Sequence, residues 1–422
     1  FSDFSDNYDS TNRLMNILYI NNFAGSKEFG MELRPYYLCK NWATAGNKSS
    51  IVAASFVHTR HTQPDVKTNL QMDKIDNVDY YWIKTPAYEG IGVARLFCFM
   101  LFILRLTFAA KRLARRIKPD FVIASSTYLL DFYPAFLIAR FAKAKLVYEI
   151  PDIQPLSLIE LFGYSHYHPF IYFLSVTEKF IYKYSDKVVC VLPNGFTHMQ
   201  KYKLPVSRYA MIPNGIDIES WRESNLPLPE DLGKIIETYK SLGFFLVGYA
   251  GYISQQNCLD QLIDTAALLQ QEKVAFLIVG DGPDKEKMME LNRRKNNVHA
   301  VFYGRIPKEA VPAFLSSMDV LFIAFKKLKL YQFGVNTNKL YEYMIQGKPV
   351  IQCQNAGNDL VAEGECGISC PAEDPKAAAD AVLTLMNMTG EERQLMGERG
   401  KLHVIEHYDY KTLSEKYLKV IQ

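Results

Sequence analysis

A short segment in the C-terminal half holds the residues best suited to bind an anionic ligand. Residues 333–351 predict a Gly- and Asn-containing loop, a short helix that ends at Gly347, and a buried strand. Free N–H groups at a helix N-terminus attract anions, and Lys339 adds a positive charge in the first turn. Glu342 shares the helix face of Lys339, where its carboxylate could bind ribose hydroxyls. The segment therefore predicts a diphosphate and ribose site, although an Asn helix cap beside a solvated Lys339–Glu342 pair would give the same pattern.

Two further groups of polar residues follow predicted strands in the N-terminal half. Gly25 lies in the loop after the first strand, and Gly30, Glu32 and Arg34 open the next helix. A glycine-bearing loop at the carboxyl end of a strand suits an acceptor or donor phosphates, and Glu32 and Arg34 could each reach it. The spacing lacks GxGxxG, so it gives little support for a dinucleotide-binding fingerprint.

Two carboxylates stand at the end of another predicted strand. The sequence YEIPD places Glu149 and Asp152 shortly before Pro155. Carboxylates at such a strand end are candidates for acid–base chemistry, whereas a cap of the following helix is the alternative role for Asp152.

Short apolar runs alternate with amphipathic stretches, which predicts an α/β fold with two doubly wound parallel sheets. The expected strands are 17–21, 51–55, 81–84, 121–124, 146–149, 188–192 and 210–212, then 244–248, 275–279, 298–302, 320–324 and 350–353. A Pro-Asn-Gly turn ends the first set, and residues 221–232 are expected to connect the domains. We expect domains at 15–214 and 215–407, a C-terminal helix at 408–422 packing back on the first domain, and a ligand site in the interdomain cleft.

Residues 93–118 combine an apolar run with a basic end. The nine apolar residues 96–104 are fewer than the roughly 20 needed to span a bilayer, so we do not expect a transmembrane helix. Such a helix could lie in the interface of an anionic membrane. A buried helix with a solvated basic end is the alternative.

Composition excludes several other classes. The 422 residues carry a net charge of +3, which gives no reason to expect nucleic acid as a partner. Seven cysteines without finger-like spacing, and two histidines at 166 and 168 without a third ligand, predict neither disulfides nor a metal site. Residues 1–14 resemble a tag or a disordered lead and contain no secretion signal. We therefore expect a cytoplasmic protein, which could also contact the inner face of the plasma membrane.

The C-terminal motifs resemble family 4 of the retaining GT-B glycosyltransferases, in the branch of bacterial O-antigen and capsule aminosugar (L-fucosamine-type) transferases. The similar stretches are VGDGPDKEKM, FYGRIPKEAVPAFLSSMDVLFIAF, NKLYEYMIQGKPVI and GISCPAEDP, and the resemblance covers most of the chain after Met15. It implies a nucleotide diphosphate sugar donor, UDP by preference, transfer with retention, and no metal or other cofactor. The acceptor would be a glycan or a polyprenyl-diphosphate-linked sugar.

The resemblance also implies roles for individual residues. Glu342 would bind the ribose, Asn338 and Lys339 the diphosphate, and Arg305 with Ile306 the nucleobase edge. Gly251 would belong to a glycine turn that approaches the phosphates, and Asp152, beside Glu149, would orient or deprotonate the acceptor.

The sequence departs from the family pattern in two places. Gly334 stands where the wider family has its first glutamate, and Ser254 to Asn257 replace an Arg and Lys pair. Charge for the diphosphate must then come from Lys339, Arg305 or Arg34. A UDP-GlcNAc 2-epimerase-like enzyme and a non-catalytic nucleotide-sugar-binding protein are therefore alternatives to a glycosyltransferase.

Overall fold

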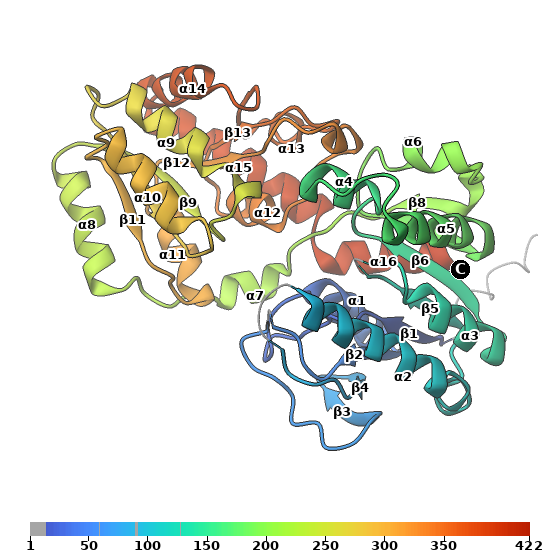
Figure 1. The fold of residues 1–422 in the computed structure, drawn as a ribbon. Coiled ribbons are helices and arrows are strands. Elements are labelled where there is room, and N and C mark those ends of the chain that lie inside the picture. The colour runs from blue at the N-terminus through green and yellow to red at the C-terminus, as the bar shows by residue number, and fades with distance from the viewer. Residues whose placement is uncertain (1–13, 59, 89–91, 127) are drawn as a thin grey trace, which may run out of the picture. The chain divides into compact units, whose positions relative to one another are not determined.

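The computed structural model describes residues 14–58, 60–88, 92–126 and 128–422, which form two compact units. Unit 1 comprises the chain up to Pro213 together with Leu413–Gln422, and unit 2 comprises Asn214–Thr412. The predicted lead at residues 1–14 lies outside the described residues except for Leu14. Each unit contains one sheet flanked by helices (Figure 1).

Unit 1 is built on an eight-stranded sheet in the order β3-β4-β2-β1-β5-β6-β7-β8. All neighbouring strands pair in parallel except β3 and β4, which are antiparallel. The strands are β1 (Asn16–Ile20), β2 (Lys48–Ala54), β3 (Gln71–Ile75), β4 (Val78–Ile83), β5 (Phe121–Ala124), β6 (Lys145–Ile150), β7 (Lys187–Cys190) and β8 (Tyr209–Met211).

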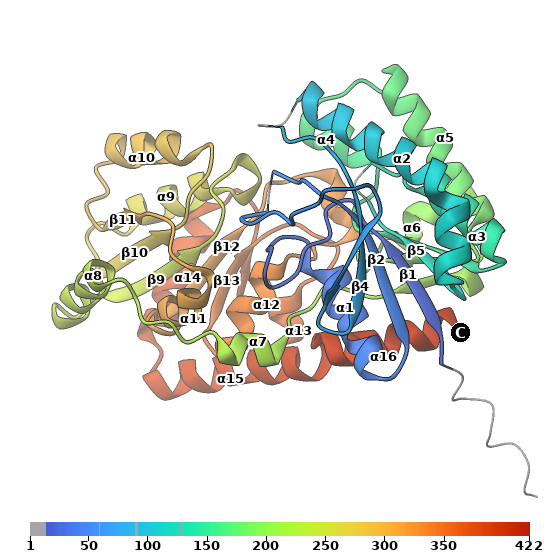
Figure 2. The same cartoon turned by 90° about the horizontal axis from the view of Figure 1, so that it is seen from below.

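Helices cover both faces of this sheet. Figure 2 shows α2, α3 and α5 on one face and α1 and α16 on the other. The C-terminal helix is held by Trp42, whose Nε1 donates to the carbonyl of Ser414 over 2.9 Å and whose ring packs on Tyr417. The helices are α1 (Leu33–Thr44), α2 (Val93–Ile117), α3 (Phe132–Ala142), α4 (Leu156–Phe162), α5 (Pro169–Tyr184), α6 (Phe196–Met199) and α16 (Tyr410–Ile421).

Unit 2 has a six-stranded, fully parallel sheet in the order β11-β10-β9-β12-β13-β14. The strands are β9 (Phe245–Ala250), β10 (Val274–Val279), β11 (Ala300–Tyr303), β12 (Val320–Ala324), β13 (Val350–Cys353) and β14 (Gly367–Cys370). The helices are α7 (Ile218–Glu223), α8 (Glu230–Ser241), α9 (Leu259–Leu268), α10 (Lys285–Arg294), α11 (Val311–Ser316), α12 (Asn338–Ile345), α13 (Leu360–Glu363), α14 (Pro375–Asn387) and α15 (Gly390–His407).

Strand β9 shows how one sequence supplies two cores. Its side chains alternate between the faces of the sheet, as in any strand. Val247 and Tyr249 pack with α9 and α14, whereas Leu246 and Ala250 pack with α8, α11 and α12. The continuous apolar run that predicted a buried strand therefore reflects burial on both faces.

The structure corrects several predicted elements. Strand β3 is missing from the predictions because its side chains are only half-buried, and β4 begins at Val78, ahead of the predicted residue 81. The predicted connection at 221–232 contains the start of α8. The segment at 367–370 is an edge strand, β14, that was not expected.

Candidate active site

Lys339 lies at the start of α12 and is held by the side chains of Tyr249 in β9 and Asn257 in the segment that follows β9. Its Nζ donates to the hydroxyl of Tyr249 over 2.9 Å and to Oδ1 of Asn257, and it lies 4.9 Å from the centre of the Tyr249 ring. Burial lowers the pKa of Lys339 to about 8, while the charge of Glu342 opposes that change. Lys339 is thus a cation that has lost much of its hydration and is fixed by the protein.

Gly251 leaves the space through which the Lys339 side chain passes. A Cβ added to Gly251 would lie 2.8 Å from Cδ of Lys339 and 3.2 Å from its Nζ. The carbonyl of Gly251 is itself so close to Gly280 that a Cβ on Gly280 would lie 1.9 Å from it. The close approach of the loops after β9 and β10 therefore depends on the missing side chain of Gly280, and the path of Lys339 depends on that of Gly251.

The first turn of α12 is not closed by a side-chain cap. Thr337 is the N-cap residue and makes no side-chain cap bond. Asn336 instead accepts a hydrogen bond from the Tyr341 hydroxyl over 2.7 Å, and Asn338 is exposed. The alternative in which an Asn side chain caps this helix is therefore wrong, and the helix N-terminus stays suited to an anion.

Glu342 pairs with a lysine that the sequence analysis did not select. Nζ of Lys308 lies 2.5 Å from Oε1 of Glu342 and 5.6 Å from the centre of the Trp221 ring. The hydrogen bonds of Lys339 go to Tyr249 and Asn257, so Lys339 and Glu342 are not the simple surface pair of the alternative interpretation. A ribose that binds Glu342 would have to share this carboxylate with Lys308.

The two residues expected at the nucleobase differ in exposure. Arg305 is exposed just beyond β11, whereas the side chain of Ile306 is 6% exposed and packs in the core beneath α11 and α12. Only the backbone of Ile306 is therefore available to a base.

Gly334 has a backbone conformation that explains why no glutamate stands there. Its φ is 105° and its ψ is 162°, a region that residues with a Cβ rarely adopt. A glutamate at this position would therefore be strained in the backbone conformation that Gly334 adopts.

In unit 1, Arg34 and Glu149 form a buried ion pair. The Arg34 guanidinium donates to both carboxylate oxygens of Glu149, over 3.0 and 2.9 Å, and Arg34 Nη2 also donates to the carbonyl of Ile212 over 3.0 Å. The Tyr19 hydroxyl donates to the same carboxylate, and Glu149 is 1% exposed. This arrangement contradicts the expected phosphate contact of Arg34 and favours a positioning role for Glu149 over the predicted catalytic one.

Glu32 and Asp152 are the exposed carboxylates of this region. Desolvation by surrounding protein, then the charges of Asp152 and Glu149, raise the pKa of Glu32 to about 7, against a hydrogen bond from Asn21. Desolvation also raises the pKa of Asp152. Burial and the nearby negative charges of Asp152 and Glu149 therefore favour the protonated form of Glu32.

The loop that carries Glu32 is tightly folded. A Cβ on Gly25 would lie 1.7 Å from the carbonyl oxygen of Gly30, and Gly30 has a positive φ of 77°. Glu32 itself is left-handed, with φ 46° and ψ 60°. The loop thus presents Glu32 at the end of β1 as the sequence predicts, with the two glycines serving its geometry.

Asp152 makes no hydrogen bond to the residues that the structure describes, and the N-cap of α4 is Pro155. The capping alternative for Asp152 is therefore wrong. His168 does act as a cap, because its Nδ1 accepts from the backbone N–H of Phe170 over 3.2 Å. No group of three or more metal-ligating side chains occurs among the described residues.

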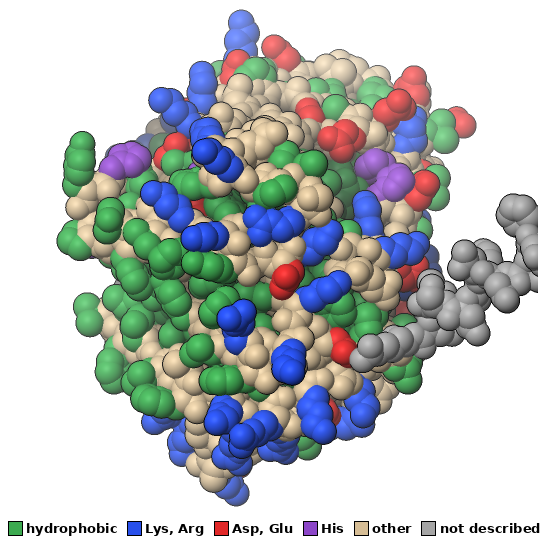
Figure 3. Space-filling model, turned by 90° about the vertical axis from the view of Figure 1, so that its right-hand side faces the viewer, with side chains coloured by type: hydrophobic (Ala, Val, Ile, Leu, Met, Phe, Trp, Pro, Cys, Tyr) green, Lys and Arg blue, Asp and Glu red, His purple; other side chains and the backbone are tan. Residues whose placement is uncertain are grey.

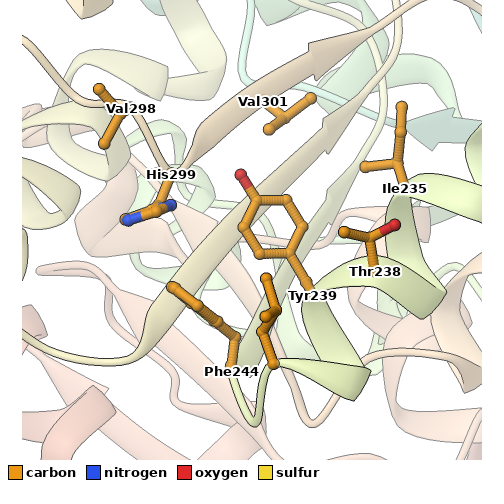
Figure 4. A pocket seen from close by; sticks show the side chains of 8 residues that line it. Ile235, Thr238, Tyr239, Phe244, Val298, His299 and Val301 are labelled. Carbon is orange, nitrogen blue, oxygen red and sulfur yellow. The ribbon is translucent and has the colours of Figure 1, made fainter.

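A cavity of about 440 Å³ in unit 2 lies away from these residues (Figure 4). Figure 4 shows Tyr239, Phe244 and His299 around it; Phe244 and His299 directly precede β9 and β11, and Tyr239 lies near the end of α8. Lys339 and Gly251 stand at the opposite, carboxyl end of the sheet, where parallel α/β sheets bind ligands. The cavity is therefore not the site that the sequence predicts.

Comparison with known proteins identifies the family. The description "Glycosyltransferase Family 4" matches residues 30–220, and "Glycosyl transferases group 1" matches residues 245–388. The chain is a family 4 glycosyltransferase. This enzyme is 23% identical over 295 residues to the probable glycosyltransferase WbjE of Pseudomonas aeruginosa, covering 68% of this chain and 70% of WbjE.

Solved structures show that the glycosyltransferase has the GT-B fold. Sucrose-phosphate synthase from Thermosynechococcus elongatus aligns with a TM-score of 0.71 at 16% identity, over 96% of this chain and 97% of that one. Anabaena HepE, solved in complex with UDP and glucose, aligns with a TM-score of 0.66 at 16% identity, over 96% and 98%. The predicted fold class is confirmed.

The residues that the sequence analysis missed are Tyr249, Asn257 and Lys308. Tyr249 and Asn257 flank the Gly251 turn, and Asn257 falls in the Ser254 to Asn257 stretch that departs from the family pattern. Lys339 was the signal that could have pointed to Tyr249 and Asn257, because a partly buried cation needs hydrogen-bond acceptors nearby.

Proposed function

We propose that the enzyme transfers a sugar from a UDP-linked HexNAc or deoxy-HexNAc to a glycan or polyprenyl-diphosphate-linked acceptor. Transfer would retain the anomeric configuration and serve the synthesis of a bacterial surface polysaccharide such as O-antigen or capsule. The donor would bind without a metal. Support comes from the resemblance of the C-terminal motifs to aminosugar transferases and from the match to WbjE.

The observation that carries the donor assignment is the fixed cation at the first turn of α12. Lys339 and the uncapped helix N-terminus offer positive charge on one side of the Gly251 turn, and Glu342 stands one turn further along. A diphosphate leaving group gains negative charge as the bond to the sugar breaks, and preorganised positive groups stabilise that charge. The UDP complexes of HepE, a protein of the same fold, support uridine as the nucleotide.

We assign the acceptor to the carboxylates at the ends of β1 and β6. In the transfer, the acceptor oxygen forms a bond to the anomeric carbon while the bond from that carbon to the diphosphate oxygen breaks. The hydroxyl proton goes to Asp152 or to the released diphosphate. Because Asp152 is exposed and free of protein partners among the described residues, it can contact a bound hydroxyl.

We place the enzyme at the inner face of the plasma membrane, with peripheral contact through residues 93–118. A lipid-linked acceptor resides there, and this segment forms the long helix α2 with a basic C-terminal end.

A thermal-shift screen tests the donor assignment. UDP, GDP, ADP and their sugar conjugates would be added with and without magnesium, since a ligand that binds only the folded state raises the melting temperature. We expect stabilisation by UDP and UDP-HexNAc without magnesium, and its loss in Glu342→Ala. Glu309→Ala is the matched control, because Glu309 is an exposed carboxylate of the same unit and should leave the shift intact.

Three results would count against the proposal. No shift with any nucleotide would remove the donor site altogether. A shift with GDP or ADP alone would change the nucleotide. A UDP shift without sugar transfer by the wild-type enzyme would favour the non-catalytic binding protein.

A further inference from the structure

The three helices on one face of the unit 1 sheet form a single layer. Helix α2 packs against α3, and α3 contacts α5 through Tyr133, whose hydroxyl lies 2.9 Å from that of Thr177 and whose ring stacks on Phe173. Figure 2 shows the three helices together on that face of the sheet. Their outward sides therefore belong to one continuous surface of unit 1.

The outward stripe of α2 is apolar for most of its length and basic at its end. Phe97, Met100, Leu104 and Phe108 are all exposed, and their spacing of three or four residues places them along one side of the helix. The exposed basic residues at 111, 112 and 115 continue the same side. The other side, which includes Phe102 and Leu106 of the core, packs inward.

The neighbouring helices extend this apolar surface. We define the apolar–basic face as the outward side of α2, α3 and α5, marked by the exposed side chains of Phe97, Leu104, Phe108, Phe141, Tyr172 and Phe180. Figure 3, which views the right-hand side of Figure 1, shows apolar side chains gathered beside Lys and Arg toward the left of the view. Single exposed apolar residues are ordinary, whereas a contiguous group of this kind marks an interaction surface.

The charges on the face have one sign. Helix α2 contains six Lys and Arg, α3 contains one and α5 contains two. The one acidic residue in these three helices is Glu178, and it is 2% exposed and bonded to His198 and Tyr182. The face therefore offers only cations to a partner, although the whole chain is nearly neutral at +3.

Helix α2 is long and apolar enough to cross a bilayer by length and composition, the one such helix in the described residues. The expectation from sequence counted only the nine apolar residues 96–104, whereas the helix that contains them is 25 residues long. Crossing would, however, remove Phe102 and Leu106 from the core of unit 1, where both are fully buried. A helix packed in this way can insert only its outward stripe.

We propose that the apolar–basic face lies flat on an anionic lipid membrane, with the aromatic and aliphatic side chains of α2, α3 and α5 in the headgroup boundary. The cations of α2 then contact lipid phosphates, which gives the surface both attractions that interfacial helices use. The segment predicted from sequence thus supplies one of the three helices of the contact. The proposal deepens the proposed function, since it rests on a lipid-linked acceptor for its purpose, but its test does not depend on catalysis.

Vesicle co-sedimentation tests the proposal with the full-length protein. Vesicles of phosphatidylcholine mixed with phosphatidylglycerol should bind the protein, vesicles of phosphatidylcholine alone should bind it far less, and high salt should weaken binding. The triple variant Lys111→Gln/Arg112→Gln/Arg115→Gln should lower the partition coefficient by about fivefold per lost cation. The control triple Lys240→Gln/Lys287→Gln/Lys376→Gln removes the same charge from unit 2, and the partition coefficient should stay near the wild-type value.

A second variant tests whether α5 contributes to vesicle binding in addition to α2. Tyr172→Ser/Phe180→Ser removes two exposed aromatic rings from α5, and we expect at least a tenfold loss of vesicle binding. Leu268→Ser/Leu402→Ser is the control, since both leucines are similarly exposed on unit 2. Unchanged melting temperatures and an unchanged UDP-induced shift would show that each variant is folded and that the donor site is intact.

Several outcomes would overturn the proposal. Absence of binding to anionic vesicles would do so even if the enzyme is active on soluble acceptors. Equal losses in the unit 2 charge control would reduce the effect to net charge, and unchanged binding by the α5 variant would restrict contact to α2. If sedimentation velocity showed a dimer that the α5 variant converts to a monomer, without vesicle binding, the face would be a self-association surface.

Discussion

Replacement of Lys339 by methionine should weaken nucleotide binding without weakening the ligand-free fold. The amino group of Lys339 is partly buried and is held by Tyr249 and Asn257. Burial lowers its pKa from 10.5 to about 8, so at pH 7 the protonated lysine destabilises the folded protein relative to the unfolded chain. Methionine has a similar length and no charge, and it removes that cost together with the two hydrogen bonds.

The two contributions to stability are of similar size. A shift from 10.5 to about 8 corresponds to about 3 kcal/mol of unfavourable free energy for the protonated lysine. The two lost hydrogen bonds to a charged donor are worth about 1.5–3 kcal/mol each at most, and less where water can replace them. We therefore expect the free energy of unfolding of ligand-free Lys339→Met to stay within about 1 kcal/mol of the wild-type value.

The same substitution should weaken UDP binding much more than it changes stability. A charge-assisted contact with the diphosphate contributes about 1.5–3 kcal/mol, so its loss should raise the dissociation constant for UDP by about 10- to 150-fold. In the wild type, affinity for UDP should fall as the pH rises above about 8, because Lys339 then loses its proton. The variant should bind weakly at all these pH values, without that decline.

Isothermal titration calorimetry with UDP and urea denaturation, each at pH 7 and pH 9, measure both effects. Between pH 8 and 10.5 the unfolded chain holds more protons at Lys339 than the fold does, so this residue makes the wild type more stable as the pH rises, and the variant lacks that contribution. Lys348→Met is the matched control. Lys348 is another partly buried lysine with a pKa lowered by burial, but it stands just before the amino end of β13.

One combination of results would refute the reasoning. If Lys339→Met bound UDP like the wild type and lost several kcal/mol of stability, Lys339 would be a structural lysine that only joins α12 to the β9 loop. Equal losses of UDP affinity in Lys348→Met would show that net charge, not the position of Lys339, determines binding.

Three other variants test the remaining assignments. Gly251→Ala places a Cβ 2.8 Å from Cδ of Lys339 and displaces that side chain, so UDP affinity should fall several-fold by calorimetry while the melting temperature barely changes. Asp152→Asn should lower kcat about 10²- to 10⁴-fold in a sugar-transfer assay and leave UDP binding intact; wild-type kcat would remove Asp152 from the chemistry. Arg34→Ala leaves Glu149 buried without its partner and should lower the free energy of unfolding by about 3–5 kcal/mol in urea, and a loss below about 1 kcal/mol would contradict the buried ion pair.

Most of the fold could be predicted because parallel sheets leave a strong pattern. Strands buried on both faces, such as β9 and β12, are continuous apolar runs, and helices separate them. The elements that were missed lack this pattern. Strand β3 is half-buried at an edge, and α8 buries only Leu232 and Ile236 within a polar sequence.

The site could be predicted only where its functional residues lie close together in the sequence. Lys339 and Glu342 stand on the same short helix, so their chemistry is visible in a dozen residues. The partners that define their state come from elsewhere, as Lys308 does for Glu342, 34 residues away. Pairing across such separations depends on the fold and leaves no periodic signal in the sequence.

Arg34 shows the same limit from the other direction. A cation near a glycine loop predicts phosphate binding. The Arg34 guanidinium instead donates to the carboxylate of Glu149, 115 residues away in the sequence, and to the carbonyl of Ile212, 178 residues away. Removing a guanidinium from such a network would leave a buried carboxylate uncompensated, so Arg34 is not free to move to a ligand. Lys339, in contrast, makes its hydrogen bonds to neutral groups. Neutral partners hold the lysine in position and leave its charge unneutralised, which is the state in which an incoming diphosphate gains most from binding it.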